Sequence, residues 1–380
     1  MKIGISAIHV RPQRSGSHQP YMVNLVEALA GLDSPHQFTI FVTPANQYLF
    51  EAARGKMDFV VYPRIVEQVL PRIFFEQLRI PLEARLRRLD VMHYPGTTAS
   101  FLIRPADVVT VHHDSVTQRG SMSRLHNFYY DALLPINKRA GVIIVPTRVY
   151  ADQLTGHFAY RPEKLRAIHH GVNPNFRNVD RMDIQEARAK YGIPENCILT
   201  VANTLPHKNI PNLLRAYDIL LTRYRLDTHL VLVGNVDRPL LAEHIAEVAS
   251  NPQEMHSHIK VISFLPHEQL PPIYAAAMLF VFYSKVETFG MPLVEAMACG
   301  LPVVASDIPI HREIMYEGAE FASPDDPEVL ASKLCRAITD EAHREIMKAA
   351  SLERSLAFSW EQTARQTIQA YEEAWSARPK

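Results

Sequence analysis

The segment 284–300, SKVETFGMPLVEAMACG, carries two glutamates on either side of a glycine–proline turn. A proline suits the first turn of a helix, because its missing N–H would have no partner there. A glycine before it lets a ligand approach the backbone closely. The N–H groups of a helix that starts after a buried strand commonly bind anions in α/β proteins. We therefore predict a phosphate site at the helix start formed by Gly290, Met291, Pro292 and Leu293.

The two glutamates would extend this site in opposite directions. We expect Glu295 on the first turn of the helix, where its carboxylate could accept two hydrogen bonds from a diol such as a ribose. Glu287 lies in the preceding loop and could bind the hydroxyl groups of a sugar attached to the phosphate. Taken alone, the pair is explained more simply as two solvated side chains. Together with the turn between them, the glutamates favour a nucleoside diphosphate sugar as the ligand.

Alternating strands and helices must position these residues. Short apolar runs alternate with amphipathic stretches along the chain, which is typical of parallel sheets covered by helices in an α/β protein. The pattern weakens at 172–190 and then restarts, so we place a domain boundary near 175–190. The stretch 360–375 predicts a last helix with no strand after it. We predict a first helix at 19–32 and strands at 2–8, 37–42, 107–112, 140–147, 197–203, 228–235, 259–265, 276–283 and 301–307.

Composition argues against several other classes of protein. Lys+Arg and Asp+Glu both number 40, so no net field would attract nucleic acid. The three cysteines are too far apart for a disulfide framework or a zinc site. The longest apolar run, 274–283, is about half the length of a membrane span. Neither a dinucleotide-binding glycine pattern nor the phosphate loop of NTPases occurs. We expect a cytoplasmic protein, with peripheral contact at the inner face of the membrane as an option.

The segment 283–306 resembles the signature of the retaining glycosyltransferases of family 4, which have the GT-B fold. Their pattern is roughly S-x-x-E-G-F-G-x-P-x-x-E-A-M-A-x-G-x-P-V-V-x-S. This chain departs from it at Thr288, where glycine is usual, and at Tyr283, where many members have proline. The matching residues are Ser284, Glu287, Phe289, Gly290, Pro292, Glu295, Ala296, Met297, Ala298, Gly300, Pro302, Val303, Val304 and Ser306.

The resemblance covers nearly the whole chain and implies two Rossmann-like domains facing a central cleft. The implied acceptor-side domain is 1–175, and the implied nucleotide-sugar domain is 190–357. The segment 358–380 would be a helix that crosses back to the N-terminal domain. The stretch IHHGVNPNF (168–176) is similar to the family's hinge into its second domain.

The resemblance also implies donor-binding residues. The segment 203–220, which begins at Asn203, is similar to the family's phosphate-binding segment, and Lys208 would contact the diphosphate just before a helix start at Asn209. Ala202 and His207 stand at the two places where the family usually has an arginine. The nucleobase would lie near Phe264 and Leu265, and the signature adds Phe289 to the donor site.

In the N-terminal half, ADVVTVHHDSV (106–116) resembles the strand that ends in the family's catalytic-domain histidine. Strand register favours His112, whereas the pairing of a histidine with a following aspartate favours His113 with Asp114. Adjacent histidines point to opposite sides of an extended chain, so we expect no metal site here. The loop containing Gly16 and Ser17 resembles the family's glycine loop, whose N–H groups could approach the diphosphate or the acceptor.

The implied activity is the transfer of a hexose, with retention, from a donor such as GDP-mannose or a UDP-sugar. The acceptor would be a hydroxyl of a glycan or a lipid-linked molecule, in polysaccharide or lipopolysaccharide biosynthesis, and no metal or other cofactor would take part. A sugar-nucleotide epimerase of the same fold and a non-catalytic nucleotide-sugar-binding protein are the alternatives. The arginine-rich segment 71–88 could touch anionic lipid or serve only the fold.

Overall fold

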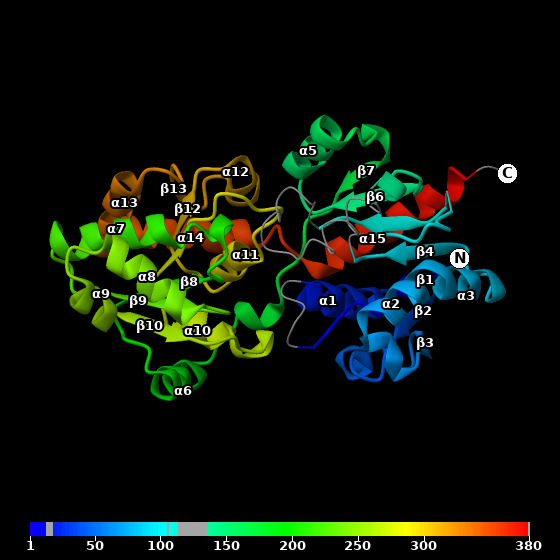
Figure 1. Cartoon of the computed structure of the whole chain (residues 1–380), viewed down its shortest axis with the longest axis horizontal. Coiled ribbons are helices and arrows are strands. Elements are labelled where there is room, and N and C mark those ends of the chain that lie inside the picture. Colours follow the sequence, from blue (N-terminus) through cyan, green and yellow to red (C-terminus); the bar gives the residue numbers. More distant parts are fainter. Residues whose placement is uncertain (13–17, 97, 105, 113–134, 379–380) are drawn as a thin grey trace. The chain divides into compact units, whose positions relative to one another are not determined.

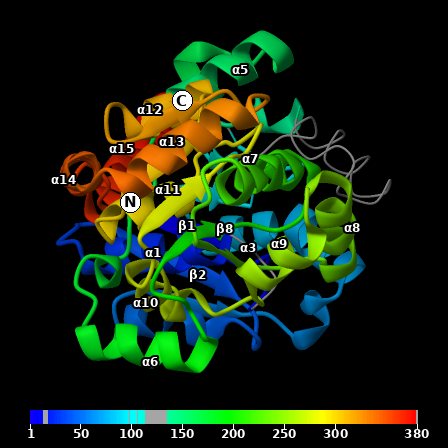
Figure 2. The ribbon, with the colours of Figure 1, turned by 90° about the vertical axis from the view of Figure 1, so that its left-hand side faces the viewer.

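The computed structural model describes residues 1–12, 18–96, 98–104, 106–112 and 135–378. The chain forms two compact units, Met1–Gly171 with Ser359–Lys380, and Val172–Phe358. The chain passes from the first unit to the second after Gly171, four residues before the end of the predicted domain 1–175. Residues 172–189 join the second unit, because the helix α6 (Arg181–Tyr191) packs there against α10 (Pro271–Ala275) (Figures 1 and 2).

The first unit is built on a seven-stranded parallel sheet (Figure 1). Its strand order is β3-β2-β1-β4-β5-β6-β7, with the order reversing between β1 and β4. The strands are β1 (Lys2–Ser6), β2 (Gln37–Val42), β3 (Asp58–Val61), β4 (Val91–Tyr94), β5 (Val108–Thr110), β6 (Val142–Val145) and β7 (Leu165–Ala167). The predicted strands 2–8, 37–42, 107–112 and 140–147 are confirmed. β3, β4 and β7 were not predicted.

Helices cover both faces of this sheet. The last helix, α15, packs against α1 and the strands β4, β5 and β6, so the chain returns to the first unit as predicted. Its Tyr371 hydroxyl lies 2.8 Å from Nδ1 of the buried His93 on β4. The helices of the first unit are α1 (His18–Gly31), α2 (Val69–Phe74), α3 (Ile80–Leu86), α5 (Arg148–Phe158) and α15 (Trp360–Ser376), with a π-turn (Phe75–Arg79) between α2 and α3.

The second unit contains a six-stranded parallel sheet in the order β10-β9-β8-β11-β12-β13. The strands are β8 (Cys197–Val201), β9 (His229–Val233), β10 (Ile259–Ile262), β11 (Leu279–Phe282), β12 (Val303–Ser306) and β13 (Glu320–Ala322). All but β13 were predicted. Besides α6 and α10, the helices are α7 (Ile210–Thr222), α8 (Arg238–Val248), α9 (Pro252–His258), α11 (Met291–Ala298), α12 (Pro309–Met315), α13 (Pro327–Thr339) and α14 (Glu341–Ser355).

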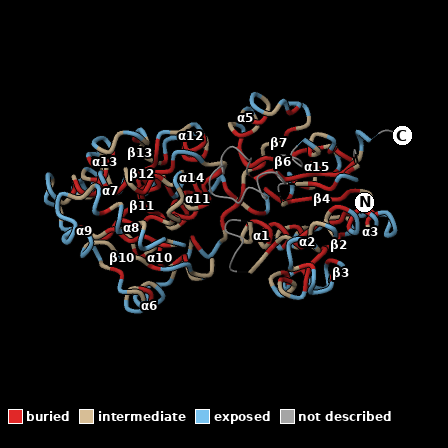
Figure 3. Tube along the Cα trace, in the orientation of Figure 1, coloured by how far each residue is buried: buried red, intermediate tan, exposed pale blue. Residues whose placement is uncertain are grey.

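Side-chain alternation along the strands divides the core of the second unit between two faces. Val281 on β11 packs in one cluster with Leu214 of α7 and Leu334 of α13. Its neighbour Phe280 points to the other face and lies 5.4 Å from the ring of Tyr274 on α10. The four central strands β8, β9, β11 and β12 are buried on both faces, as their largely red trace in Figure 3 shows, which is why they read as continuous apolar runs.

Two glycines of the first unit allow a matched test of its packing. A Cβ on Gly171 would stand 2.2 Å from the backbone N of Trp360, where α15 begins, whereas a Cβ on Gly156 in α5 would meet nothing within 4 Å. We expect Gly171→Ala to lower the free energy of unfolding by about 2 kcal/mol or more, because the backbone must shift. Gly156→Ala should raise it by roughly 0.5–1 kcal/mol, through helix propensity. Urea unfolding would contradict the account if the two variants changed stability equally.

Candidate functional site

The strand order of the second unit reverses between β8 and β11, and the predicted site residues follow the carboxyl ends of these two strands. Parallel sheets commonly bind ligands at such a reversal. Lys208 closes the short turn after β8, and Glu287 lies in the loop after β11. Lys208 Nζ is 2.5 Å from Glu287 Oε1 and lies 4.9 Å from the centre of the Phe282 ring. The backbone N–H of Lys285 donates to the carbonyl of His207 and ties the two loops together.

The Lys208–Glu287 ion pair is largely buried, with side-chain exposures of 15% and 13%. Burial raises the pKa of Glu287, but the ammonium of Lys208 more than offsets it, so the pKa falls below its usual value. At neutral pH the carboxylate is therefore ionised. It can accept hydrogen bonds from sugar hydroxyls or stabilise positive charge nearby.

Two residues that were not predicted as site residues hold the loop that carries Glu287. Ser306, at the end of β12, donates from its hydroxyl to the carbonyl of Ser284. The fully buried His311 of α12 lies 3.0 Å from the Ser306 hydroxyl through Nδ1. Burial lowers the pKa of His311 to about 4, even with Glu287 nearby, so its ring is neutral at neutral pH. Ser306 matched the signature, but the contact depends on the pairing of β11 with β12.

Glu295 lies at the start of the second turn of α11, whereas the sequence placed it in the first turn. The helix begins at Met291, so Glu295 is its fifth residue and is 4% exposed. Its Oε1 is 2.7 Å from Nε2 of His267, and its Oε2 accepts a hydrogen bond of 2.8 Å from the Tyr274 hydroxyl. Burial is the main cause that raises the pKa of Tyr274 well above its usual value, and the negative charge of Glu295 raises it further. The phenol therefore stays protonated. Each carboxylate oxygen keeps a lone pair with which it could accept from a diol.

The start of α11 offers fewer donors than predicted. Gly290 adopts the left-handed conformation, with φ of 90°, and precedes the first helical residue. Of the four predicted positions, Pro292 has no N–H, and the N–H of Leu293 already donates to the carbonyl of Gly290 at 2.9 Å. Among these four described positions, only Gly290 and Met291 therefore have N–H groups that could bind a phosphate. Phe289, beside this turn, is 3% exposed.

The other predicted donor residues lie on neighbouring loops. Asn203 Oδ1 accepts from the backbone N–H of Leu205 at 3.1 Å and so fixes the turn that leads to Lys208. Phe264 and Leu265 follow β10 at the same edge of the sheet, and the Phe264 side chain is 48% exposed. Two residues later, His267 makes its contact with Glu295. This contact connects the predicted nucleobase segment to the signature helix.

The helix α7 begins after Asn209, as expected, but the capping contact differs. Asn209 has a φ of 57°, and its side chain donates to the carbonyl of Pro324 instead of capping the helix. Next to it, burial and then the charge of Lys208 lower the pKa of His207. His207 is therefore neutral at neutral pH and does not supply the positive charge of the family's missing arginine.

Of the predicted residues in the first unit, only His112 lies within the described residues; His113, Asp114, Gly16 and Ser17 lie outside them. His112 is 7% exposed and follows β5. Its ring centre lies 4.4 Å from that of Tyr21, 4.8 Å from that of His18 and 5.3 Å from that of His170. The structure thus places His112 in a buried aromatic cluster.

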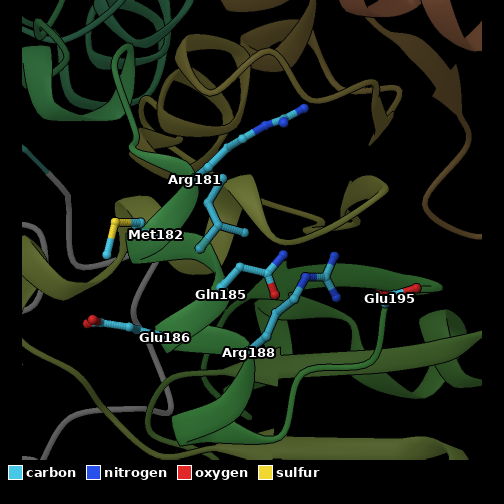
Figure 4. A pocket seen from close by; sticks show the side chains of 7 residues that line it. Arg181, Met182, Gln185, Glu186, Arg188 and Glu195 are labelled. Carbon is cyan, nitrogen blue, oxygen red and sulfur yellow. The ribbon is translucent and has the colours of Figure 1, made fainter.

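A pocket in the second unit lies along α6 and includes none of the signature residues (Figure 4). It is lined by Gln185, Arg188 and Glu195, among others. The Arg188 guanidinium already donates to the carbonyls of Pro194 and Ala276, so it has a structural role. Within the described ranges, no group of three or more His, Cys, Asp or Glu side chains could hold a metal ion. No described helix is long and apolar enough to cross a bilayer.

The contact between His267 and Glu295 predicts a pH dependence. Burial lowers the pKa of His267, but the charge and hydrogen bond of Glu295 outweigh it, so the pKa is raised above 6.5. The contact therefore stabilises the fold fully below pH 6.5 and loses its effect as the pH rises through the folded-state pKa. In Glu295→Gln, only the weaker effect of the Glu268 charge still opposes burial, and we expect the NMR titration midpoint of His267 to fall below 6.5. An unchanged midpoint would contradict this assignment.

Two family models match the chain. The model for Glycosyltransferase Family 4 matches residues 19–176, and the model for Glycosyl transferases group 1 matches residues 183–354. Together they cover most of both units.

Curated relatives agree with these matches. The O-antigen chain mannosyltransferase B of Escherichia coli is 34% identical over 175 residues, which cover 46% of this chain and 45% of that protein. A D-inositol 3-phosphate glycosyltransferase of Nocardioides sp. is 33% identical over 251 residues, which cover 62% of this chain and 54% of that protein. The chain thus spans about half the length of these relatives.

Solved structures share the fold over the whole chain. HepE from Anabaena, crystallised with UDP and glucose, superposes with a TM-score of 0.74 at 18% identity, covering 98% of this chain and 99% of that chain. WaaG, a glycosyltransferase involved in lipopolysaccharide biosynthesis, gives a TM-score of 0.71 at 14% identity, covering 97% and 98%. Two parallel-sheet, Rossmann-like units are the architecture of GT-B glycosyltransferases. The chain therefore belongs to the group 1 glycosyltransferases of family 4 and has the GT-B fold.

Proposed function

We propose that this protein is a retaining hexosyltransferase that uses a nucleoside diphosphate sugar as donor. The acceptor would be a hydroxyl of a glycan or lipid-linked molecule in polysaccharide or lipopolysaccharide biosynthesis. The observation that carries the proposal is the Lys208–Glu287 ion pair at the carboxyl ends of β8 and β11, beside the start of α11.

The charges around this ion pair suit a sugar diphosphate. The ammonium of Lys208 and the N–H groups of Gly290 and Met291 attract an anion, whereas the ionised Glu287 attracts hydroxyl groups or developing positive charge. Glu295, behind the helix start, would bind the ribose with its remaining lone pairs. Phe264 and Leu265 would then lie near the base. This order matches the sequence of groups in a nucleoside diphosphate sugar.

In the proposed reaction, the bond between the sugar C1 and the diphosphate oxygen breaks, and a bond from C1 to the acceptor oxygen forms on the same face. The acceptor proton passes to the leaving diphosphate. Lys208 and the helix start stabilise the negative charge that develops on that diphosphate. Glu287 stabilises the positive charge on the sugar ring and orients its hydroxyls. No metal or other cofactor is assigned a role.

The relatives guide the choice of donor. Two are named as O-antigen chain mannosyltransferases, so GDP-mannose is the first donor to test. HepE was crystallised with UDP and glucose, so UDP-glucose is the second. Purified protein should transfer radiolabel from one of these donors to a lipid-linked oligosaccharide acceptor. NMR of the product should show the donor's anomeric configuration.

Two results would overturn this proposal. Turnover of the donor to an epimer without acceptor would indicate an epimerase. Tight binding of a nucleotide sugar without transfer to any acceptor in a broad glycan panel would indicate a binding protein.

A comparison of two lysine variants in neighbouring loops can distinguish specific donor binding from a general effect of charge. We expect Lys208→Ala to weaken nucleoside diphosphate binding by about tenfold or more, because it removes a buried charge-assisted contact. Lys285→Ala is the matched control, since its side chain is 44% exposed and pairs with Asp325. Isothermal titration with GDP and UDP would measure both. Equal losses in the two variants would exclude a specific role for Lys208.

For the carboxylate of Glu287, we predict an effect on catalysis and not on nucleotide binding. Glu287→Gln keeps the shape of the side chain but removes its charge. We expect kcat to fall by about a hundredfold or more, because charge stabilisation in the transition state is lost, while binding of the nucleoside diphosphate changes little. An unchanged kcat at saturating donor would show that Glu287 has no catalytic role.

A further inference from the structure

A row of exposed apolar side chains runs along α2, the π-turn and α3 in the first unit. Its members are spaced four residues apart, and their exposed fractions range from 47% to 74%. Leucine and phenylalanine side chains are normally buried in folded proteins. A contiguous patch of exposed ones therefore marks an interaction surface. The row consists of Leu70, Phe74, Leu78, Leu82 and Leu86.

The π-turn keeps this row on one side. In an uninterrupted α-helix, sixteen residues at about 100° each would rotate the last side chain by roughly 160° from the first. The π-turn Phe75–Arg79 adds one residue without a matching rotation, which reduces this drift to roughly 60°. Side chains at every fourth position therefore stay on one side of this interrupted helix.

The opposite side of the helix already serves the core. Ile80 and Ala84 are buried in the cluster that contains Val109 and Ile143 of the sheet. The exposed row is thus not the face that folding requires to be apolar.

The π-turn also positions a second apolar element. It places Gln77 inward, where its Oε1 accepts from the backbone N–H of Phe101 at 2.8 Å, and its backbone carbonyl accepts from Ser100 Oγ at 2.6 Å. The loop that these bonds hold against the turn carries Phe101 and Leu102, which are 52% and 39% exposed. The apolar surface thus extends beyond the helix.

The charges beside the row are unequally placed. Residues 64–88 contain six arginines and three glutamates, a net charge of +3. Arg79 and Arg87 are 46% and 43% exposed, but Glu83, which pairs with both, is only 13% exposed. Arg85 and Arg88 are exposed as well. Arg72 is the exception, since its side chain is only 17% exposed. Around α3, Glu83 lies closer to the protein, and the four exposed arginines flank the apolar row.

We propose that this surface, defined by the row Leu70 to Leu86 with Phe101 and Leu102, docks on an anionic lipid bilayer. Apolar side chains would enter the headgroup region, and the surrounding arginines would pair with lipid phosphates. A protein partner would more often present carboxylates in fixed positions and a polar rim. The exposed Arg79, Arg85, Arg87 and Arg88 instead form a positive border, which matches the diffuse negative charge of a membrane. Docking does not depend on the proposed transfer reaction.

Co-sedimentation of the full chain with vesicles tests the proposal. We expect binding to phosphatidylglycerol–phosphatidylethanolamine vesicles at low salt, at least tenfold weaker binding to neutral phosphatidylcholine vesicles, and a marked loss in high salt. Leu78→Glu with Leu82→Glu should reduce binding at least tenfold. Arg85→Gln with Arg88→Gln should reduce the preference for anionic lipid.

A matched control uses exposed apolar residues of the second unit. Ile346 and Leu356 are 68% and 66% exposed, so Ile346→Glu with Leu356→Glu makes the same chemical change elsewhere and should leave vesicle binding unchanged. Thermal unfolding of all variants confirms that each is folded. Equal binding of the wild type and the Leu78/Leu82 variant would overturn the proposal. Concentration-dependent self-association that this variant abolishes, without vesicle binding, would assign the surface to a second copy instead.

Discussion

The Lys208–Glu287 ion pair is the contact on which the rest of the candidate site depends. Two charged side chains with little exposure to water are stable only when they remain together. Each comes from a loop at the carboxyl edge of the sheet, and the strand reversal between β8 and β11 brings those loops side by side. A ligand that binds here must offer an anion to Lys208 and polar groups to Glu287, and a sugar attached to a diphosphate offers both.

A second layer of polar contacts fixes the groups around this ion pair. Ser306 and His311 hold the loop before Glu287, and His267 and Tyr274 fix the carboxylate of Glu295. These partners come from strands and helices that frame the site, so its geometry is set before any ligand arrives. Preorganisation of this kind lowers the cost of binding and of charge development.

The sequence predicted most of the buried strands and the signature helix, because apolar runs and the glycine–proline turn are local patterns. It did not predict short strands such as β3, whose residues are only partly buried. It also missed His267 and Tyr274, since their hydrogen bonds to Glu295 span 28 and 21 residues and leave no local pattern. The smaller number of donors at the helix start could not be predicted, because it depends on the hydrogen bond from Leu293 to Gly290 that only the structure shows. The alignment of the exposed row on α2 and α3 could not be predicted either, because it depends on the π-turn, and no residue pattern in the sequence indicates that turn.

A crystal structure of the protein with GDP or UDP tests the central claim most directly. The account predicts that the terminal phosphate lies within hydrogen-bonding distance of Lys208 Nζ and of the N–H groups of Gly290 and Met291. Glu287 would then face the position of the missing sugar. A nucleotide bound elsewhere, with Lys208 still paired only with Glu287, would contradict the account.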